Sequence, residues 1–198
     1  MLIPYLLKVN ADKRYIVAQS GITLQALHAE LAKYDLAMIN VGSISDQTLA
    51  GIVTTATHGS GIKYGVMSTH VMALTILMAD GSRLYCSRDE QPDLFVASIC
   101  GLGSTGLVLT IQLEVEPAFR LKEISETLEF DEAVARMGAL VSASEHVRFW
   151  WFPVAGTIRA SSANRTKEVW FLSNVSQSIL MYFMCSRERQ LVAGYGIH

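Results

Sequence analysis

The chain has 198 residues, of which 51% are hydrophobic and 17% charged, and its formal net charge at pH 7 is -2. That length can bury one good core, or one domain and part of another. The balanced charge, with no basic run and no basic stripe among aromatic residues, gives no electrostatic support for a nucleic-acid partner. The three cysteines and five histidines lack the spacing of a disulfide scaffold or a metal site, so we expect neither.

The first predicted elements are a strand and a helix. Residues 14–18 read as a strand, and Thr23 is placed to cap the helix that follows. The expected apolar face of this helix is Leu24, Leu27, Leu31 and Tyr34. Residues 37–41 then lead into a stretch of small residues.

The stretch from Gly42 to Gly61 is the most informative part of the chain, and we expect it to form one loop system. Glycine lets the backbone approach a ligand closely, so that successive amides can point at an anion. The stretch contains no lysine or arginine, so a pyrophosphate held here would depend on amide and hydroxyl dipoles. The alternative is that its composition marks only turns and tight packing.

Two strands and a helix are expected next. Residues 71–78 and 83–86 flank an Asp-Gly step that predicts a hairpin. Residues 101–106 match the G-x-G-x-x-G pattern of dinucleotide-binding folds, which requires a strand before it and a helix after it. Here the predicted order is reversed, because residues 93–99 read as a helix and residues 107–115 alternate as a strand. We therefore reject a Rossmann fold.

A domain boundary is expected near residues 116–119, where a long strand ends at a proline. After it we expect a strand at 121–130, a helix at 131–141 and a strand pair at 147–152 and 157–160. The residues expected on one side of the helix are Ala133, Val134, Met137 and Val141. The aromatic run 150–152 reads as a half-buried strand, with direct substrate contact as the alternative. The fold class is mixed α+β.

The order of residues in the small-residue stretch resembles the flavin-binding segment of one enzyme family. Gly-Ser-Ile-Ser-Asp-Gln-Thr-Leu-Ala-Gly at 42–51, followed by Thr-Ala-Thr-His-Gly-Ser-Gly at 55–61, is similar to the aldonolactone oxidases, which are vanillyl-alcohol-oxidase-like FAD enzymes. The resemblance extends to the Arg-Phe-Trp-Trp-Phe-Pro segment at 148–153. It implies part of a vanillyl-alcohol-oxidase/PCMH-type FAD-binding domain in residues 1–117 and the start of an α+β substrate (cap) domain in residues 118–198.

The resemblance also implies a set of residues that contact FAD. Most of them would line the pyrophosphate and ribityl region, and the last would cover the adenosine end. They are Ser43, Thr48, Gly51, Thr55, Ala56, Thr57, His58, Gly59 and Val108. We assign His58 to cofactor contact rather than to proton transfer, and we assign no catalytic residue.

The chain departs from the family pattern at both ends. Family members begin with a Gly-Gly-Gly-His-Ser-type loop, whose histidine in many members bonds covalently to the flavin, and they close with a His-Trp-x-Lys-type segment. Neither motif is found in this sequence. We therefore expect both domains to be truncated, FAD binding to be weak at best, and turnover to be absent.

The activity that the resemblance implies is that of an oxidoreductase. Its substrate would be an aldono-1,4-lactone of the D-arabinono or L-gulono type, its electron acceptor oxygen, and its pathway the biosynthesis of ascorbate or erythroascorbate. Two alternatives stay open, a non-enzymatic remnant and an alditol-oxidase-like flavin oxidase. Turnover of alditols but not of aldonolactones would favour the second.

Membrane association is a further expectation. The apolar segments 169–172 and 179–185 are too interrupted for a spanning helix, but they fit an interfacial helix or a helix that packs on another part of the protein. Eukaryotic members of the family are often membrane-associated, so a membrane-associated or mitochondrial location is suspected from the resemblance.

Overall fold

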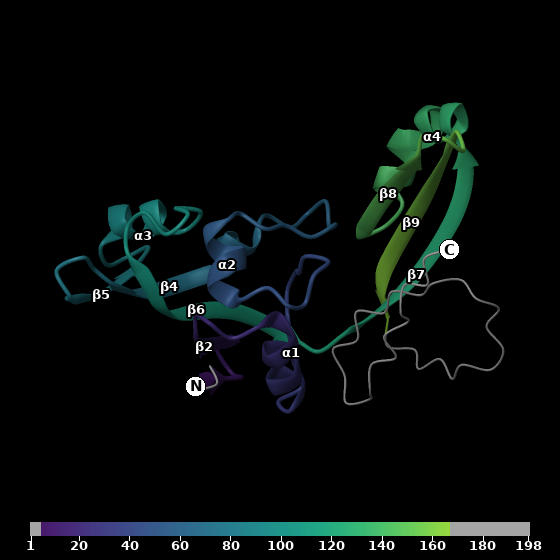
Figure 1. The fold of residues 1–198 in the computed structure, drawn as a ribbon. Helices are drawn as coiled ribbons and strands as arrows, with labels where there is room; N and C mark the ends of the chain where they lie inside the picture. The colour runs from purple at the N-terminus through teal and green to yellow at the C-terminus, as the bar shows by residue number, and fades with distance from the viewer. Residues whose placement is uncertain (1–4, 167–198) are drawn as a thin grey trace. The chain divides into compact units, whose positions relative to one another are not determined.

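The computed structural model describes residues 5–166 of the chain (Figure 1). These residues belong to two compact units. One unit runs up to Gly59 and resumes at Tyr64–Ala118, and the other contains Ser60–Lys63 and the chain from Phe119 onward.

The first unit is built around an antiparallel sheet. Its strands lie in the order β1-β2-β6-β4-β5, and β3 pairs with the far end of β6. The strands are β1 (Leu6–Asn10), β2 (Tyr15–Gln19), β3 (Leu36–Met38), β4 (Val71–Leu77), β5 (Arg83–Ser87) and β6 (Leu107–Pro117). The helices are α1 (Leu24–Ala32), α2 (Leu49–Thr54), the short 3-10 helix η1 (Met67–His70) and α3 (Pro92–Ser98).

The core of this unit follows from strand alternation. Ile16 and Ala18 of β2 lie opposite Leu113 and Ile111 of β6, and all four side chains are buried. Because side chains in a strand point alternately to opposite faces, this register places a continuous apolar surface on one side of the sheet. Burying each large aliphatic side chain contributes roughly 1.5–3 kcal/mol, so this surface is the main source of stability in the unit.

Helix α1 begins as the sequence predicts, but its apolar face is shorter. Thr23 Oγ1 accepts a hydrogen bond from Ala26 N at 3.2 Å, and Leu24, Leu27 and Leu31 are fully buried. The prediction that Tyr34 belongs to this face is wrong. The helix ends at Ala32, and Tyr34 is 52% exposed in the turn that follows.

The remaining elements of the first unit keep the predicted order. β4 and β5 form the hairpin, and Asp80 Oδ1 accepts from Ser82 N at 2.9 Å within its turn. The glycine-rich residues 101–106 lie between α3 and β6, so a helix precedes them and a strand follows. This is the opposite of the order that a Rossmann phosphate-binding loop requires.

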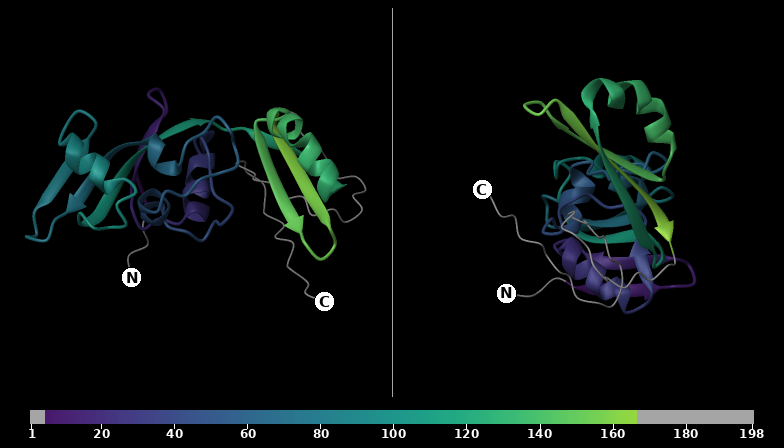
Figure 2. Two further views of the ribbon diagram at one scale, coloured as in Figure 1. Left: turned by 90° about the horizontal axis from the view of Figure 1, so that it is seen from above. Right: turned by 90° about the vertical axis from the view of Figure 1, so that its right-hand side faces the viewer.

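The second unit consists of a three-stranded antiparallel sheet and one helix. The strand order is β7 (Arg120–Glu129), β9 (Thr157–Thr166), β8 (His146–Phe152). Helix α4 (Phe130–Ser142) lies against one face of this sheet, as Figure 2 shows. β9 extends well beyond the predicted 157–160 because its whole length pairs with β7.

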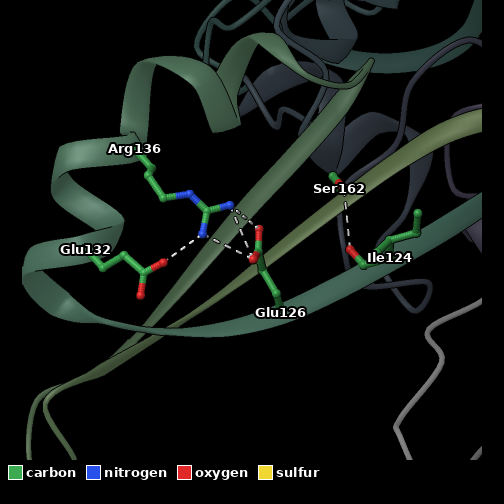
Figure 3. Close-up of polar contacts among 5 residues, drawn as sticks. All are labelled: Ile124, Glu126, Glu132, Arg136 and Ser162. Carbon is green, nitrogen blue, oxygen red and sulfur yellow. Dashed lines mark hydrogen bonds and ion pairs between the residues drawn. The ribbon is translucent and has the colours of Figure 1, made fainter.

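The predicted face of α4 needs one correction. Ala133 is fully buried, and Leu140 packs with it against Leu128 and Ile158 of the sheet. Val134, expected on the same side, is 51% exposed. Residues 133, 137 and 140 follow the helical period, and Val134 falls outside that stripe. The helix is also tied to β7 by Arg136, whose guanidinium donates to Glu126 and to Glu132 (Figure 3).

Candidate functional site

The stretch from Gly42 to Gly61 is not one continuous loop, because the six-residue helix α2 interrupts it. Thr48 is the N-cap of this helix, and its Oγ1 accepts from Gly51 N at 3.2 Å. Leu49, Ile52 and Val53 are buried. These three apolar residues at helical spacing are the sequence signal for the helix. The prediction of one loop over residues 42–61 did not take this signal into account.

The backbone N–H groups at the start of α2 are already used inside the protein. Leu49 N donates to Ile22 O at 2.8 Å, and Ala50 N donates to Ser20 O at 2.8 Å. With Gly51 N bonded to Thr48, the first-turn amides are not available to an anion. In the ligand-free protein Thr48 and Gly51 therefore shape this site, and their contact with FAD stays a prediction.

The Thr48 cap provides a test of this arrangement. Thr48→Ala removes the acceptor of Gly51 N, and we expect the free energy of unfolding to fall by about 1 kcal/mol. Thr48→Ser keeps the oxygen and should stay within a few tenths of a kcal/mol of the wild type. Urea unfolding of the three proteins measures both effects, and equal losses in the two variants would contradict the capping role.

The hydroxyls at the end of α2 form a short chain of hydrogen bonds. Thr55 Oγ1 donates to Gly51 O at 2.8 Å, so it acts as acceptor in its 3.3 Å contact with Thr57 Oγ1. Between them Ala56 has a φ of 55°, the left-handed conformation that ends helices and that glycine adopts more easily. The Thr57 hydroxyl therefore donates to Thr55 in the ligand-free protein. Its proton can rotate toward a ligand without breaking the bond between Thr55 and Gly51 O.

His58 is exposed, and its ring contacts the backbone next to it. Nδ1 lies 2.9 Å from Gly59 O, and because a carbonyl oxygen only accepts, Nδ1 carries the proton in this contact. Nε2 is then an acceptor in the neutral ring. The backbone of His58 also forms an isolated antiparallel β-bridge with Val66, and Thr57 O accepts from Met67 N at 2.7 Å. Residues 57–58 are therefore held in place by backbone contacts with the start of η1.

Two glycines let residues 40–42 and 57–59 pack side by side. A Cβ on Gly42 would lie 2.9 Å from Thr57 Cγ2, and a Cβ on Gly59 would lie 2.0 Å from Asn40 Oδ1. Each segment thus lacks a side chain where the other inserts one. The sequence gives no signal for Asn40, because its position against Gly59 depends on packing between two separate segments of the chain.

Ser43 and Val108 are the remaining predicted site residues, and they differ in exposure. Ser43 is exposed, and neither its hydroxyl nor its N–H bonds to another described residue. The Val108 side chain is in the core and only 6% exposed. Ser20 connects Val108 to α2, because its Oγ donates to Val108 O at 2.6 Å and its own carbonyl accepts from Ala50 N.

The residues present fit a cofactor that is held by dipoles. Two segments, residues 40–43 and 55–59, carry side chains that can hydrogen-bond to a ligand: the hydroxyls of Ser43 and Thr57 and the exposed ring of His58. We call these two segments the cradle. They contain no lysine or arginine, so they offer hydrogen bonds rather than ion pairs to a pyrophosphate.

The second unit contains a pocket that the sequence did not predict. It has a volume of about 260 Å³ and lies between α4 and the sheet, and Ile124 and Leu140 are among its apolar lining residues. Its polar lining includes Glu126 and Arg136, which are hydrogen-bonded to each other (Figure 3). The pocket therefore presents no unpaired charge from this pair to a ligand.

Two sequence expectations concern membranes and metals. Within residues 5–166, no helix has the length and apolarity that crossing a membrane requires. The apolar segments 169–172 and 179–185, on which the expectation of an interfacial helix was based, lie outside the described residues. In the part of the chain that the structure describes, no group of three or more histidine, cysteine, aspartate or glutamate side chains could hold a metal ion.

The chain is similar to known families and proteins along most of its length. Residues 3–87 match the family of FAD binding domains, and residues 111–187 match the family described as D-arabinono-1,4-lactone oxidase. L-gulonolactone oxidase of Mus musculus is 39% identical over 147 residues, which are 74% of this chain and 33% of the relative. D-arabinono-1,4-lactone oxidase of Yarrowia lipolytica (strain CLIB 122 / E 150) is 39% identical over 140 residues, 71% of this chain and 27% of the relative. The chain spans about a third of the length of the curated relatives it matches.

Solved structures share the fold at lower sequence identity. Cholesterol oxidase from B. sterolicum superposes with a TM-score of 0.72 at 18% identity, covering 82% of this chain and 34% of that chain. A solvent-stable cholesterol oxidase gives a TM-score of 0.70 at 23% identity, covering 78% of this chain and 32% of that chain. The predicted α+β fold with part of a PCMH-type FAD-binding domain is confirmed, and the match of residues 3–87 confirms FAD as the cofactor.

Proposed function

Because this chain belongs to the aldonolactone oxidase family, we propose that the protein uses FAD to oxidise an aldono-1,4-lactone. The observation that carries the proposal is the order of the two matches along the chain. An FAD binding domain comes first and a lactone-oxidase segment second. Relatives at 39% identity are named for oxidation of two such lactones, L-gulonolactone and D-arabinono-1,4-lactone.

The domain and site assignments are part of this proposal. Residues 1–117 contribute to the FAD-binding domain and residues 118–198 to the substrate domain. The cradle is supported as the cofactor site by the hydroxyl and N–H of Ser43, which bond to no other residue among 5–166, and by the Thr57 hydroxyl, which contacts only Thr55 in the ligand-free protein as far as these residues show. Thr48 and Gly51 form the capped start of α2, which lies between the two cradle segments in the sequence.

The residues of this chain have a binding and orienting role. FAD, when bound, would supply the redox chemistry as the acceptor of a hydride equivalent. The Ser43 hydroxyl donates a hydrogen bond to the cofactor, and the Thr57 hydroxyl does so by turning its proton away from Thr55. The buried face of α2 holds the cradle on the sheet. His58 contacts the cofactor and does not move a proton in this scheme. Oxygen is the proposed acceptor, and ascorbate- or erythroascorbate-type biosynthesis is the proposed pathway.

Retention of FAD by the purified chain is the first test of the proposal. The protein is incubated with FAD and passed through a gel-filtration column, and the protein peak is scanned for flavin absorption. The sequence alone predicts weak binding at best, but the cradle and α2 belong to one unit with a continuous core, so we now expect flavin bands to elute with a compact protein peak. A colourless peak would contradict FAD binding by this chain, and elution as soluble aggregate would support the non-enzymatic remnant.

Substrate class is tested by a second measurement on the flavin-loaded protein. Lactone-dependent peroxide formation is followed with L-gulono-1,4-lactone, D-arabinono-1,4-lactone and an alditol. Peroxide with either lactone supports the proposed reaction and oxygen as acceptor. Peroxide with the alditol alone would replace the lactone proposal by alditol oxidation.

A further inference from the structure

The side-chain amide of Asn40 contains a buried hydrogen-bond donor that has no acceptor among residues 5–166. The residue is only 4% exposed. Its Oδ1 accepts from Val41 N at 3.1 Å, and this bond identifies which amide atom is the oxygen. The other atom, Nδ2, has no hydrogen-bond partner among residues 5–166. A buried NH₂ group is thus left without an acceptor.

This amide lies at the junction of the two cradle segments. A Cβ on Gly59 would lie 2.0 Å from Oδ1 and 2.6 Å from Cγ of Asn40, so the Gly59 backbone packs directly on the amide. Gly59 is flanked by the exposed His58, which is a predicted FAD contact. The unpaired donor therefore belongs to the part of the molecule assigned to the cofactor, and the residue that covers it has no side chain.

A donor in this position destabilises the ligand-free protein. Buried polar groups are nearly always hydrogen-bonded, and a buried donor without an acceptor loses its hydration with no compensating bond. The loss is recovered when a ligand supplies an acceptor. FAD is rich in acceptors, because its pyrophosphate and ribityl chain both present oxygen atoms.

We propose that Asn40 is a cofactor-positioning residue whose Nδ2 donates a hydrogen bond to an oxygen of bound FAD. The inference rests on the proposed function, since it requires that the cradle holds FAD. It adds to the predicted site a residue that precedes Ser43 in the same segment. Asn40 thereby connects the packing of the two cradle segments to the affinity for the cofactor.

The test compares FAD affinity and ligand-free stability in the same variants. Asn40→Leu keeps the branched shape and the number of heavy atoms, adds no charge and removes both polar amide atoms. Asn40→Ala serves as the second variant in case the bulkier leucine protein does not fold. Asn10→Ala is the matched control, because Asn10 Oδ1 also accepts a backbone N–H, that of Lys13 at 2.9 Å, but lies outside the cradle. FAD dissociation constants are measured by flavin fluorescence, and stability without FAD by urea unfolding.

We expect the Asn40 variants to bind FAD roughly 10- to 100-fold more weakly than the wild type, the loss typical of a hydrogen bond to a charged group. The urea midpoint of ligand-free Asn40→Leu should stay close to that of the wild type, because the unpaired donor disappears together with the Val41 bond. A purely structural role would lower the midpoint without weakening FAD binding in the folded protein.

FAD dissociation constants within twofold of the wild type in both variants would overturn the inference and leave the proposed function intact. A wild-type chain that binds no FAD would overturn both. A loss of affinity in Asn10→Ala as large as in the Asn40 variants would also overturn the inference, because the effect would not belong to the cradle.

Discussion

Gly59→Ala is expected to destabilise the first unit by about 2–3 kcal/mol and to abolish FAD binding. The new Cβ would lie 2.0 Å from Asn40 Oδ1 and 2.7 Å from Val41 O. The asparagine side chain can rotate away, but only by breaking its bond to Val41 N. The carbonyl cannot move without shifting the backbone of residues 40–42. Both cradle segments would therefore separate, and the groups assigned to the cofactor would separate with them.

Urea unfolding and FAD titration of Gly59→Ala measure the two effects. The informative control is the double variant Asn40→Ala, Gly59→Ala, which removes the nearest obstacle but leaves the Val41 carbonyl in place. It should be more stable than the sum of the two single changes predicts, because contacting residues are not additive. Strict additivity would show that Asn40 and Gly59 do not compete for the same space.

The regular elements of this chain could be predicted from its sequence because their signals are local. The alternation of apolar and polar residues is sufficient to predict β2 and β6. The Asp-Gly step at 80–81 is sufficient to predict the hairpin between β4 and β5. Thr23 caps α1 through an atom only three residues away. Where the local signal is ambiguous, as at Val134, the tertiary packing determines which side of the helix is buried.

The candidate site was harder to predict, because its composition has two physical meanings. Small residues are found both in ligand-binding loops and where the chain packs closely on itself. The structure shows such close packing at Gly42 and Gly59. Helix α2 was hidden within the same stretch, since only two turns separate Thr48 from Thr55 and the surrounding glycine and hydroxyl residues are typical of a loop. Asn40 gave no sequence signal, because its partner Gly59 comes from a segment on the far side of α2.

Gly106→Ala is expected to cost the first unit about 3–5 kcal/mol, the sum of backbone strain and overpacking. Gly106 has a φ of 148°, which side chains rarely adopt, and it immediately precedes β6. A Cβ there would lie 2.5 Å from Leu77 O and 2.8 Å from Ile76 Cγ2. Both neighbours belong to β4, which pairs with β6, so relief of the clash requires the central strands of the sheet to separate.

Gly103→Ala separates strain from clash in this prediction. Gly103 has a φ of 78°, and no atom lies within 4 Å of the position that its Cβ would take. Its substitution should therefore cost only the conformational term, about 1 kcal/mol. Thermal unfolding of the two variants should show a much lower midpoint for Gly106→Ala. Equal midpoints would contradict the prediction, because they would mean that the start of β6 shifts to accommodate the added methyl group. The pairing of Val108 with Ile76 of β4 would then be less constrained than the structure indicates.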